Sequence, residues 1–290
     1  MFPPGRFVGA ALAAIVVFAV GGCASAGSVA AGRATGAAST ACVKDQLRVK
    51  TAGKLTVGTD NPVYEPWFVD NKPGNGKGFE SAVAYAVARQ LGFADTDVVW
   101  TTANFNAAIA PGPKTFDVDI NEVSITADRA KVIDFSRGYY DVAQAVVTVK
   151  GSRIAGARSI ADLKNATLGA QVGTTSYTTI TDVIRPAARP AVFNSNDDAK
   201  AALSNGQIDG LVLDLPTALY EAKADLKQGV LVGQFRRTVG VPEQFGLVLD
   251  KDSPLTSCVS RAVDALRSAG TLGHLEQQWL TSAVGAPILA

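Results

Sequence analysis

Short apolar runs and stretches of helical spacing alternate along the chain from residue 55 to residue 280. Phe79, Val83, Val87 and Leu91 recur every four residues, which places them on one face of a helix that ends before Gly92. Apolar runs bounded by turn residues are typical of buried strands. They predict strands at Leu55–Thr59, Val98–Trp100, Phe116–Ile120, Ala145–Val149, Thr167–Val172, Ile208–Leu213 and Phe245–Leu249.

The segments between these strands carry helix signals. Ser159, Asn196 and Thr271 stand where N-caps are expected, and Gly206 and Gly270 stand where helices end. The expected helices are Phe79–Leu91, Phe105–Ile109, Ile160–Leu163, Tyr177–Ile184, Asp197–Leu203, Thr217–Lys223, a helix that starts at Ser253-Pro254, and a last one that carries Leu272, Leu275 and Trp279. Strands that alternate with helices indicate α/β units with largely parallel sheets.

The first 23 residues form a secretory signal in our interpretation. Arg6 precedes the apolar run Phe7–Val20, and Gly21 and Gly22 precede Cys23. The VGGC ending resembles the lipobox of bacterial lipoproteins, and by that resemblance Cys23 is lipidated. The alternative is a signal cleaved elsewhere, with Cys23 discarded. Residues 24–45, rich in Ala, Gly, Ser and Thr, are expected to form a flexible tether. The protein would then be anchored to the cell membrane on its extracytoplasmic side.

Charge and cysteine content narrow the function classes. The net charge is +1 and no basic run occurs, which argues against a nucleic-acid partner. The single histidine, His274, leaves little from which to build a metal site or a Ser–His–Asp triad. Besides Cys23 the chain has Cys42 and Cys258. An even pair in an exported chain points to one disulfide, and the alternative is two unpaired thiols.

A bond between Cys42 and Cys258 would bring the end of the chain back onto the first α/β unit. The expected organisation is a first lobe over residues 46–142, a second over 143–239, and a return to the first over 240–290. The chain would then cross between the lobes near Asp141–Gln144 and near Val239–Gln244. Two lobes joined in this way form a cleft that closes by hinge bending.

Polar residues stand just beyond four of the predicted strands. Ligands bind open α/β sheets at the carboxyl ends of their strands, and Asp60, Glu122, Thr174 and Asp214 occupy such positions. After one of these strands, Thr126 precedes Arg129 at the expected start of a helix, which is a favourable place for an anion. The Arg129 guanidinium can hold a carboxylate through two charge-assisted bonds. The alternative is a surface pair of Arg129 with Asp128 or Asp134.

Several motifs together resemble the family 3 extracellular solute-binding proteins, the polar amino-acid-binding proteins of ABC importers. The resemblance covers roughly Leu55 to Leu280. Its motifs are LTVGTD (55–60), YEPW (64–67), GFE (78–80), SITADRAKVIDFS (124–136), GTT (173–175) and IDGLVLD (208–214). The resemblance implies the two-lobed periplasmic-binding-protein fold of type II. It also implies an amino-acid ligand, delivery to the permease of an importer, no catalysis and no cofactor, and we expect a monomer.

The resemblance also implies roles for individual residues. Arg129 matches the arginine that holds the ligand's α-carboxylate, with Ser124 in the same turn. Thr175, beside Thr174, matches the hydroxyl residue that reaches this carboxylate from the other lobe. Asp214 matches the aspartate that accepts the α-ammonium group, although an Asp before Pro216 could instead cap the next helix.

Three further matches concern the side chain of the ligand. Tyr64 and Phe105 match aromatic positions that sandwich it, and Asp60 matches a position that reads its far end. The structural alternatives are core positions for both aromatic residues and a turn cap for Asp60.

Glu122 departs from the family pattern, in which Gly or Ser is usual. If Glu122 faces the cleft, it adds a second carboxylate to Asp60 and favours a cationic side chain on the ligand. Glutamine or another neutral polar amino acid is the alternative ligand. Otherwise Glu122 points away and pairs with Arg129 or Lys131. A different function on the same scaffold is a cyclohexadienyl (prephenate or arogenate) dehydratase with Glu122 as general acid. Asp214 argues against that activity, because it suits the ammonium group of an amino acid.

Overall fold

The computed structural model describes residues 42–235, 242–280 and 285–289. Its first sheet has the strand order β2-β1-β3-β10-β4. The strands are β1 (Leu55–Thr59), β2 (Val98–Thr102), β3 (Val118–Asp119), β4 (Asp134–Asp141) and β10 (Gln244–Leu249). β1 pairs in parallel with β2 and β3, whereas β10 runs antiparallel to β3 and β4. This sheet and its helices form the first lobe.

A second sheet has the strand order β11-β9-β5-β8-β6-β7. Its strands are β5 (Gln144–Val149), β6 (Leu168–Gln171), β7 (Ala191–Phe193), β8 (Gly210–Asp214), β9 (Gly229–Phe235) and β11 (Ile288–Leu289). The first crossover is the short step from β4 to β5 through Val142 and Ala143. β10 follows Glu243 and belongs to the first sheet, so the chain has returned by that point. The second sheet and its helices form the second lobe.

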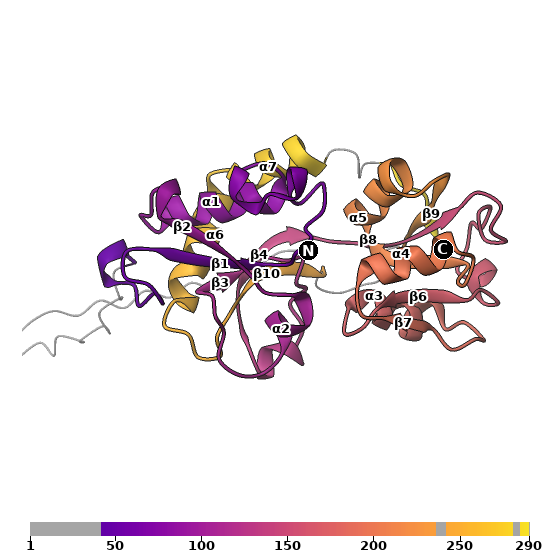
Figure 1. Cartoon of the computed structure of the whole chain (residues 1–290), viewed down its shortest axis with the longest axis horizontal. Coiled ribbons are helices and arrows are strands. Elements are labelled where there is room, and N and C mark those ends of the chain that lie inside the picture. The colour runs from indigo at the N-terminus through magenta and orange to yellow at the C-terminus, as the bar shows by residue number, and fades with distance from the viewer. Residues whose placement is uncertain (1–41, 236–241, 281–284, 290) are drawn as a thin grey trace, which may run out of the picture. The chain divides into compact units, whose positions relative to one another are not determined.

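Helices flank both sheets, as Figure 1 shows. The α-helices are α1 (Phe79–Gln90), α2 (Phe105–Ile109), α3 (Thr175–Thr178), α4 (Asn196–Ser204), α5 (Leu215–Tyr220), α6 (Thr256–Ser268) and α7 (Thr271–Leu280). The 3₁₀ helices are Lys44–Gln46, Val69–Asn71, Pro73–Asn75, Asp95–Asp97, Arg129–Lys131 and Ala161–Leu163, and π-helical segments at Thr179–Ile184 and Glu221–Asp225 extend α3 and α5.

Alternation along the strands distributes the core over both faces of each sheet. In β5, Ala145 and Val147 pack with α4 and α5, while Val146 packs with Ile180 and other residues on the opposite face. Because both faces are buried, these strands appear in the sequence as continuous apolar runs. In the first lobe the main core lies under α1, α6 and α7, with Trp67 fully buried in it. The α/β class and the two-lobed organisation are therefore confirmed.

The structure differs from the sequence expectations in several places. β4, β7, β9 and β11 were not predicted, because β4 and β9 mix polar residues or glycine into the strand and β7 and β11 are very short. Ser195, rather than Asn196, caps α4, since its hydroxyl accepts from the Asp198 N–H. The helix expected at Arg129 is a single 3₁₀ turn, because the β4 strand starts soon after it.

Two expected boundaries also need correction. β11 pairs in parallel with β9, so the last described residues return to the second lobe rather than to the first. At the other end, residues 42–45 belong to the folded body, where Lys44 bonds Asp97 at 2.5 Å, and not to the tether. The expected signal (1–23), the lipidation site Cys23 and the tether up to residue 41 lie outside the described residues. Within the described ranges no helix is long and apolar enough to span a membrane.

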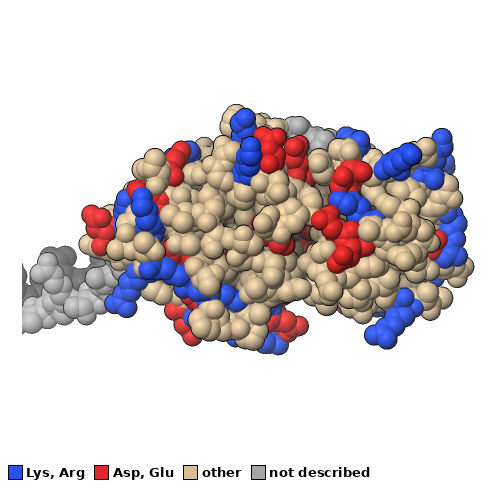
Figure 2. Space-filling view, viewed as in Figure 1, with Lys and Arg blue, Asp and Glu red and all other residues tan. Residues whose placement is uncertain are grey.

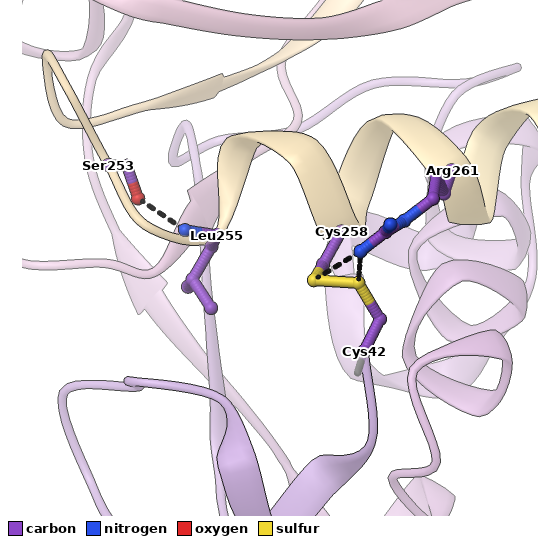
Figure 3. Close-up of a disulfide and its surroundings, with 5 residues drawn as sticks. All are labelled: Cys42, Ser253, Leu255, Cys258 and Arg261. Atoms are coloured by element: carbon purple, nitrogen blue, oxygen red, sulfur yellow. Dashed lines mark hydrogen bonds between the residues drawn. A yellow bond between two sulfur atoms is a disulfide. The ribbon is translucent and has the colours of Figure 1, made fainter. Parts of the chain in front are cut away.

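The sulfur atoms of Cys42 and Cys258 are joined in the structure (Figure 3). Their Cα atoms are 5.4 Å apart, and the two residues are 216 positions apart in sequence. Cys258 lies on the buried face of α6. The Arg261 guanidinium, one turn further along α6, donates to both sulfur atoms. The contact ties the start of the folded body to the returning segment.

Candidate functional site

A cavity lies between the two lobes, and its walls come from both. All nine residues expected to bind the ligand line it: Asp60, Tyr64, Phe105, Glu122, Ser124, Arg129, Thr174, Thr175 and Asp214. They come together because most of them follow the carboxyl ends of strands, and those ends face the other lobe. The structure adds lining residues that the sequence did not indicate, among them Ser176, Asp197 and Thr217.

Arg129 occupies one end of the cavity. Its Nη1 donates to the Ser124 carbonyl at 2.6 Å, and its Nη2 donates across the cleft to the Gly173 carbonyl at 2.9 Å. The guanidinium also lies over the Phe105 ring, 5.3 Å from its centre. The alternative of a surface pair is wrong, because Asp128 bonds Lys131 and Asp134 bonds Lys251. A guanidinium held by two carbonyls keeps further N–H donors for an anion in the cavity.

Hydroxyl groups from both lobes meet beside Arg129. Ser124 Oγ lies 3.4 Å from Thr175 Oγ1. Thr174 has a local role as well, because its Oγ1 accepts from the Tyr177 N–H at the start of α3. α3 begins at this wall, and the hydroxyl groups add to the polar character of its N-terminal end.

Asp214 lies at the end of β8 and lines the same cavity as Arg129 and the hydroxyl groups. Burial raises the pKa of its carboxyl well above the ordinary value, and the charge of Glu243 raises it further. The Gln144 amide opposes this by donating to Oδ1 at 2.6 Å. The side chain makes no cap bond to the helix that follows, so the structural alternative for Asp214 is wrong.

Two residues behind the cavity were missed by the sequence analysis. Gln144 Nε2 lies 3.3 Å from Glu243 Oε1, and Ser124 Oγ donates to the same oxygen at 2.6 Å. Ser176 Oγ donates to Gln144 Oε1, which orients the amide. Gln144 and Glu243 belong to the two different crossovers, and no local sequence signal places them together.

The other end of the cavity carries Asp60 and the two aromatic residues. Asp60 accepts from the Asn61 N–H at 2.8 Å, so it caps the turn and also lines the cavity. Tyr64 and Phe105 are half-buried wall residues rather than core. The Tyr64 hydroxyl donates across the cleft to Asp197 at 2.5 Å.

Glu122 faces the cavity. Its Oε2 accepts from the Thr217 hydroxyl at 2.7 Å, and its N–H donates to Glu80 Oε1 at 2.7 Å. Burial raises the pKa of Glu122 well above its ordinary value, and the charges of Glu80 and Asp214 raise it further. Burial also raises the pKa of Glu80, to about 7. The alternative pairing of Glu122 with Arg129 or Lys131 is not found.

Among the described residues, the charged ones that line the cavity are four acids, Asp60, Glu122, Asp197 and Asp214, and one base, Arg129. Figure 2 shows acidic side chains gathered near α4, the helix whose first turn carries Asp197. This excess of carboxyl groups favours a ligand with net positive charge. Within the described residues no cluster of three or more His, Cys, Asp or Glu could hold a metal ion.

Comparison with known proteins identifies the family and confirms the two-lobed type II fold. The model of the bacterial extracellular solute-binding proteins, family 3, matches residues 55–282. The chain belongs to this family, whose members here are amino-acid-binding proteins of ABC transporters. It is 27% identical over 209 residues to the ABC transporter arginine-binding protein 1 of Escherichia coli (strain K12), covering 70% of this chain and 81% of that protein.

Two solved structures are also similar. An ancestral arginine-binding protein bound to glutamine has a TM-score of 0.65 and 28% identity, and the match covers 79% of this chain and 98% of that one. The ancestral amino acid-binding protein AncCDT-1, a precursor of cyclohexadienyl dehydratase, has a TM-score of 0.62 and 29% identity, over 78% of this chain and 95% of that one.

Proposed function

We propose that this protein captures an α-amino acid with a cationic side chain in the interlobe cavity and delivers it to the permease of an ABC importer. The observation that carries the proposal is the opposition of Arg129 from the first lobe and Asp214 from the second in one cavity. The first suits the α-carboxylate and the second the α-ammonium of any amino acid. Because each lobe supplies one partner, ligand contacts draw the lobes together.

We propose that Asp60 and Glu122 recognise the side chain of the ligand. Both are carboxyl groups in the wall of the cavity, with Tyr64 and Phe105 available for apolar contact along the ligand. Carboxyl groups in this position repel acidic side chains. The arginine-binding relatives support this ligand class, while the glutamine found in the ancestral protein keeps a neutral polar side chain as the second candidate.

A second candidate function is the dehydratase activity, with Glu122 as general acid. It is favoured by the raised pKa of Glu122, since a protonated carboxyl is what an elimination needs. One observation weighs against prephenate as its substrate. Asp214 suits an ammonium group, which prephenate lacks. Release of carbon dioxide and water from prephenate by the purified protein would support the dehydratase.

A ligand panel tests the charge argument. On ligand-stripped protein, arginine or lysine should raise the thermal midpoint more than glutamate does. Asp60→Asn should erode that advantage, because it removes one of the two reading carboxylates. The matched control is Asp45→Asn, a change of an exposed residue in the first 3₁₀ helix.

The panel has informative alternative outcomes. Strongest stabilisation by glutamate would show that the charge argument is wrong. Glutamine could instead raise the thermal midpoint most, and Asp60→Asn could reduce that rise. Asp60 would then act as an acceptor for an amide, and the ligand class would change to neutral amino acids.

We also propose that Cys23 is lipidated and that the tether keeps the lobes near the extracytoplasmic face of the membrane. The lipobox-like VGGC sequence after an apolar run supports this. In the native host, Cys23→Ala should abolish the lipid-modified species on detergent partitioning, whereas Ser25→Ala should not. Equal partitioning of parent and Cys23→Ala would exclude the anchor.

A further inference from the structure

Thr217 forms hydrogen bonds across the cleft to two side chains of the first lobe. The Trp67 indole N–H donates to Thr217 Oγ1 at 2.8 Å, and Thr217 Oγ1 donates to Glu122 Oε2 at 2.7 Å. Trp67 and Glu122 belong to the first lobe, and Thr217 belongs to α5 in the second. Trp67 is fully buried, and Thr217 is 4% exposed. The chain of bonds therefore exists only while the lobes are together.

The chemistry of the indole sets the direction of the first bond, and the geometry of the hydroxyl group gives the second. An indole N–H can only donate, so Thr217 must accept from Trp67. The single hydroxyl hydrogen of Thr217 is then directed at Glu122, which accepts through Oε2. Oε1 of Glu122 has no hydrogen bond to the described residues, and Glu122 lines the cavity. One carboxyl oxygen is thus held by the protein and the other is left to the ligand.

The backbone of Glu122 is held differently from its side chain. Its φ is +53°, a left-handed value that is uncommon for a residue other than glycine. Glu80 Oε1 accepts the Glu122 N–H, and the Tyr139 hydroxyl donates to the same oxygen. These contacts lie within the first lobe. The side chain, in contrast, takes its hydrogen bond from the second lobe.

We propose that Thr217 is a specificity-determining positioning residue, which orients the Glu122 carboxyl toward the ligand's side chain when the cleft closes. The inference rests on the proposed function, since it takes Glu122 as a reader of a cationic side chain. Its consequence is that the protein discriminates between side chains during closure. A ligand that merely enters the first lobe meets a Glu122 side chain that is not yet oriented.

The test compares arginine with citrulline, its uncharged isostere, by titration calorimetry. Thr217→Val keeps the shape and removes the hydroxyl, so arginine affinity should fall by about fivefold or more while citrulline affinity changes by less than about twofold. Thr217→Ser restores the hydroxyl and should behave like the parent. In a Glu122→Gln background, Thr217→Val should leave the ratio of the two affinities unchanged. Thr178→Val, on the exposed surface of α3, is the matched control.

Equal losses for arginine and citrulline would overturn the inference, because Thr217 would then stabilise closure without selecting the ligand. No loss for either would overturn it as well. If Thr217→Val is unstable because the Trp67 indole is left unpaired, the comparison is made with Trp67→Phe and with Trp67→Phe/Thr217→Val. Loss of arginine selectivity on adding the second change supports the inference, and its retention contradicts it.

A measurement without ligand separates the inference from the proposed function. If the folded parent binds no amino acid, the proposed function is wrong, yet the bridge can still be tested. The ¹⁵N indole resonance of Trp67, assigned with Trp67→Phe, should move in Thr217→Val and in Glu122→Gln, but not in Thr217→Ser. The comparison is made on ligand-free protein that small-angle X-ray scattering shows to be as compact as this structure, because the bridge exists only while the lobes are together. An unmoved resonance in Thr217→Val under that condition would contradict the bridge itself.

Discussion

Replacing Arg129 by Ala should weaken the binding of every α-amino acid by at least tenfold. The change leaves a ligand carboxylate in the cavity without its counter-charge, which costs about 2–5 kcal/mol, and about 1.4 kcal/mol corresponds to tenfold. It also removes the bond from Arg129 to the Gly173 carbonyl of the second lobe. The effect should not depend on the side chain of the ligand, because the carboxylate is common to all amino acids. Titration calorimetry with a basic and a neutral amino acid measures it.

Matched variants separate charge from geometry. Arg129→Lys keeps the positive charge but loses the planar fork, so its affinity should lie between those of parent and Arg129→Ala. Arg137→Ala removes an exposed arginine of β4, which only approaches Asp264 at 3.8 Å, and should bind like the parent. Asp214→Asn keeps an oxygen that accepts from Gln144 but removes the charge. Its affinity for amino acids should also fall by at least about tenfold. Affinities within about threefold of the parent for both Arg129→Ala and Asp214→Asn would reject the site assignment.

Removing the link between Cys42 and Cys258 should lower the free energy of unfolding by about 2–5 kcal/mol. The two cysteines are 216 residues apart, and the chain-entropy model gives about 5 kcal/mol for a loop of that length. Denaturant unfolding of the oxidised parent and of Cys42→Ser measures the change. The ligand affinity should remain close to that of the parent, because neither cysteine lines the cavity.

The cysteine variants contain their own control. The same bond is absent from Cys42→Ser, from Cys258→Ser and from the double variant. The decrease in the free energy of unfolding should therefore be similar in all three rather than additive. Cys258 is buried on α6, so any excess loss in Cys258→Ser reports packing. Thiol labelling of the unfolded, non-reduced protein that starts at residue 24 should find no free thiol. Two labelled thiols would show that the bond does not form.

The sequence, read with the family resemblance, was sufficient for the fold class and for nine of the residues that surround the cavity. Parallel strands leave their carboxyl ends at one edge of a sheet, so the polar residues after β6 and β8 were expected to lie close together. β1 (Leu55–Thr59) and α2 (Phe105–Ile109) were predicted with the bounds that the structure has. The helix at Phe79 was placed by its four-residue spacing and ends one residue earlier than expected.

Only the tertiary structure decided which groups each cavity residue bonds. Glu122 could face the cleft or turn away, and it faces the cleft because Thr217, 95 positions later, supplies a hydrogen bond there. Two other contacts likewise join residues that are far apart in sequence. Trp67 bonds Thr217, 150 positions later, and Gln144 at the start of β5 lies beside Glu243, just before β10. The periodicity of a sequence records which face of an element is buried. It does not record the partner across a cleft, because that partner depends on how the two lobes meet.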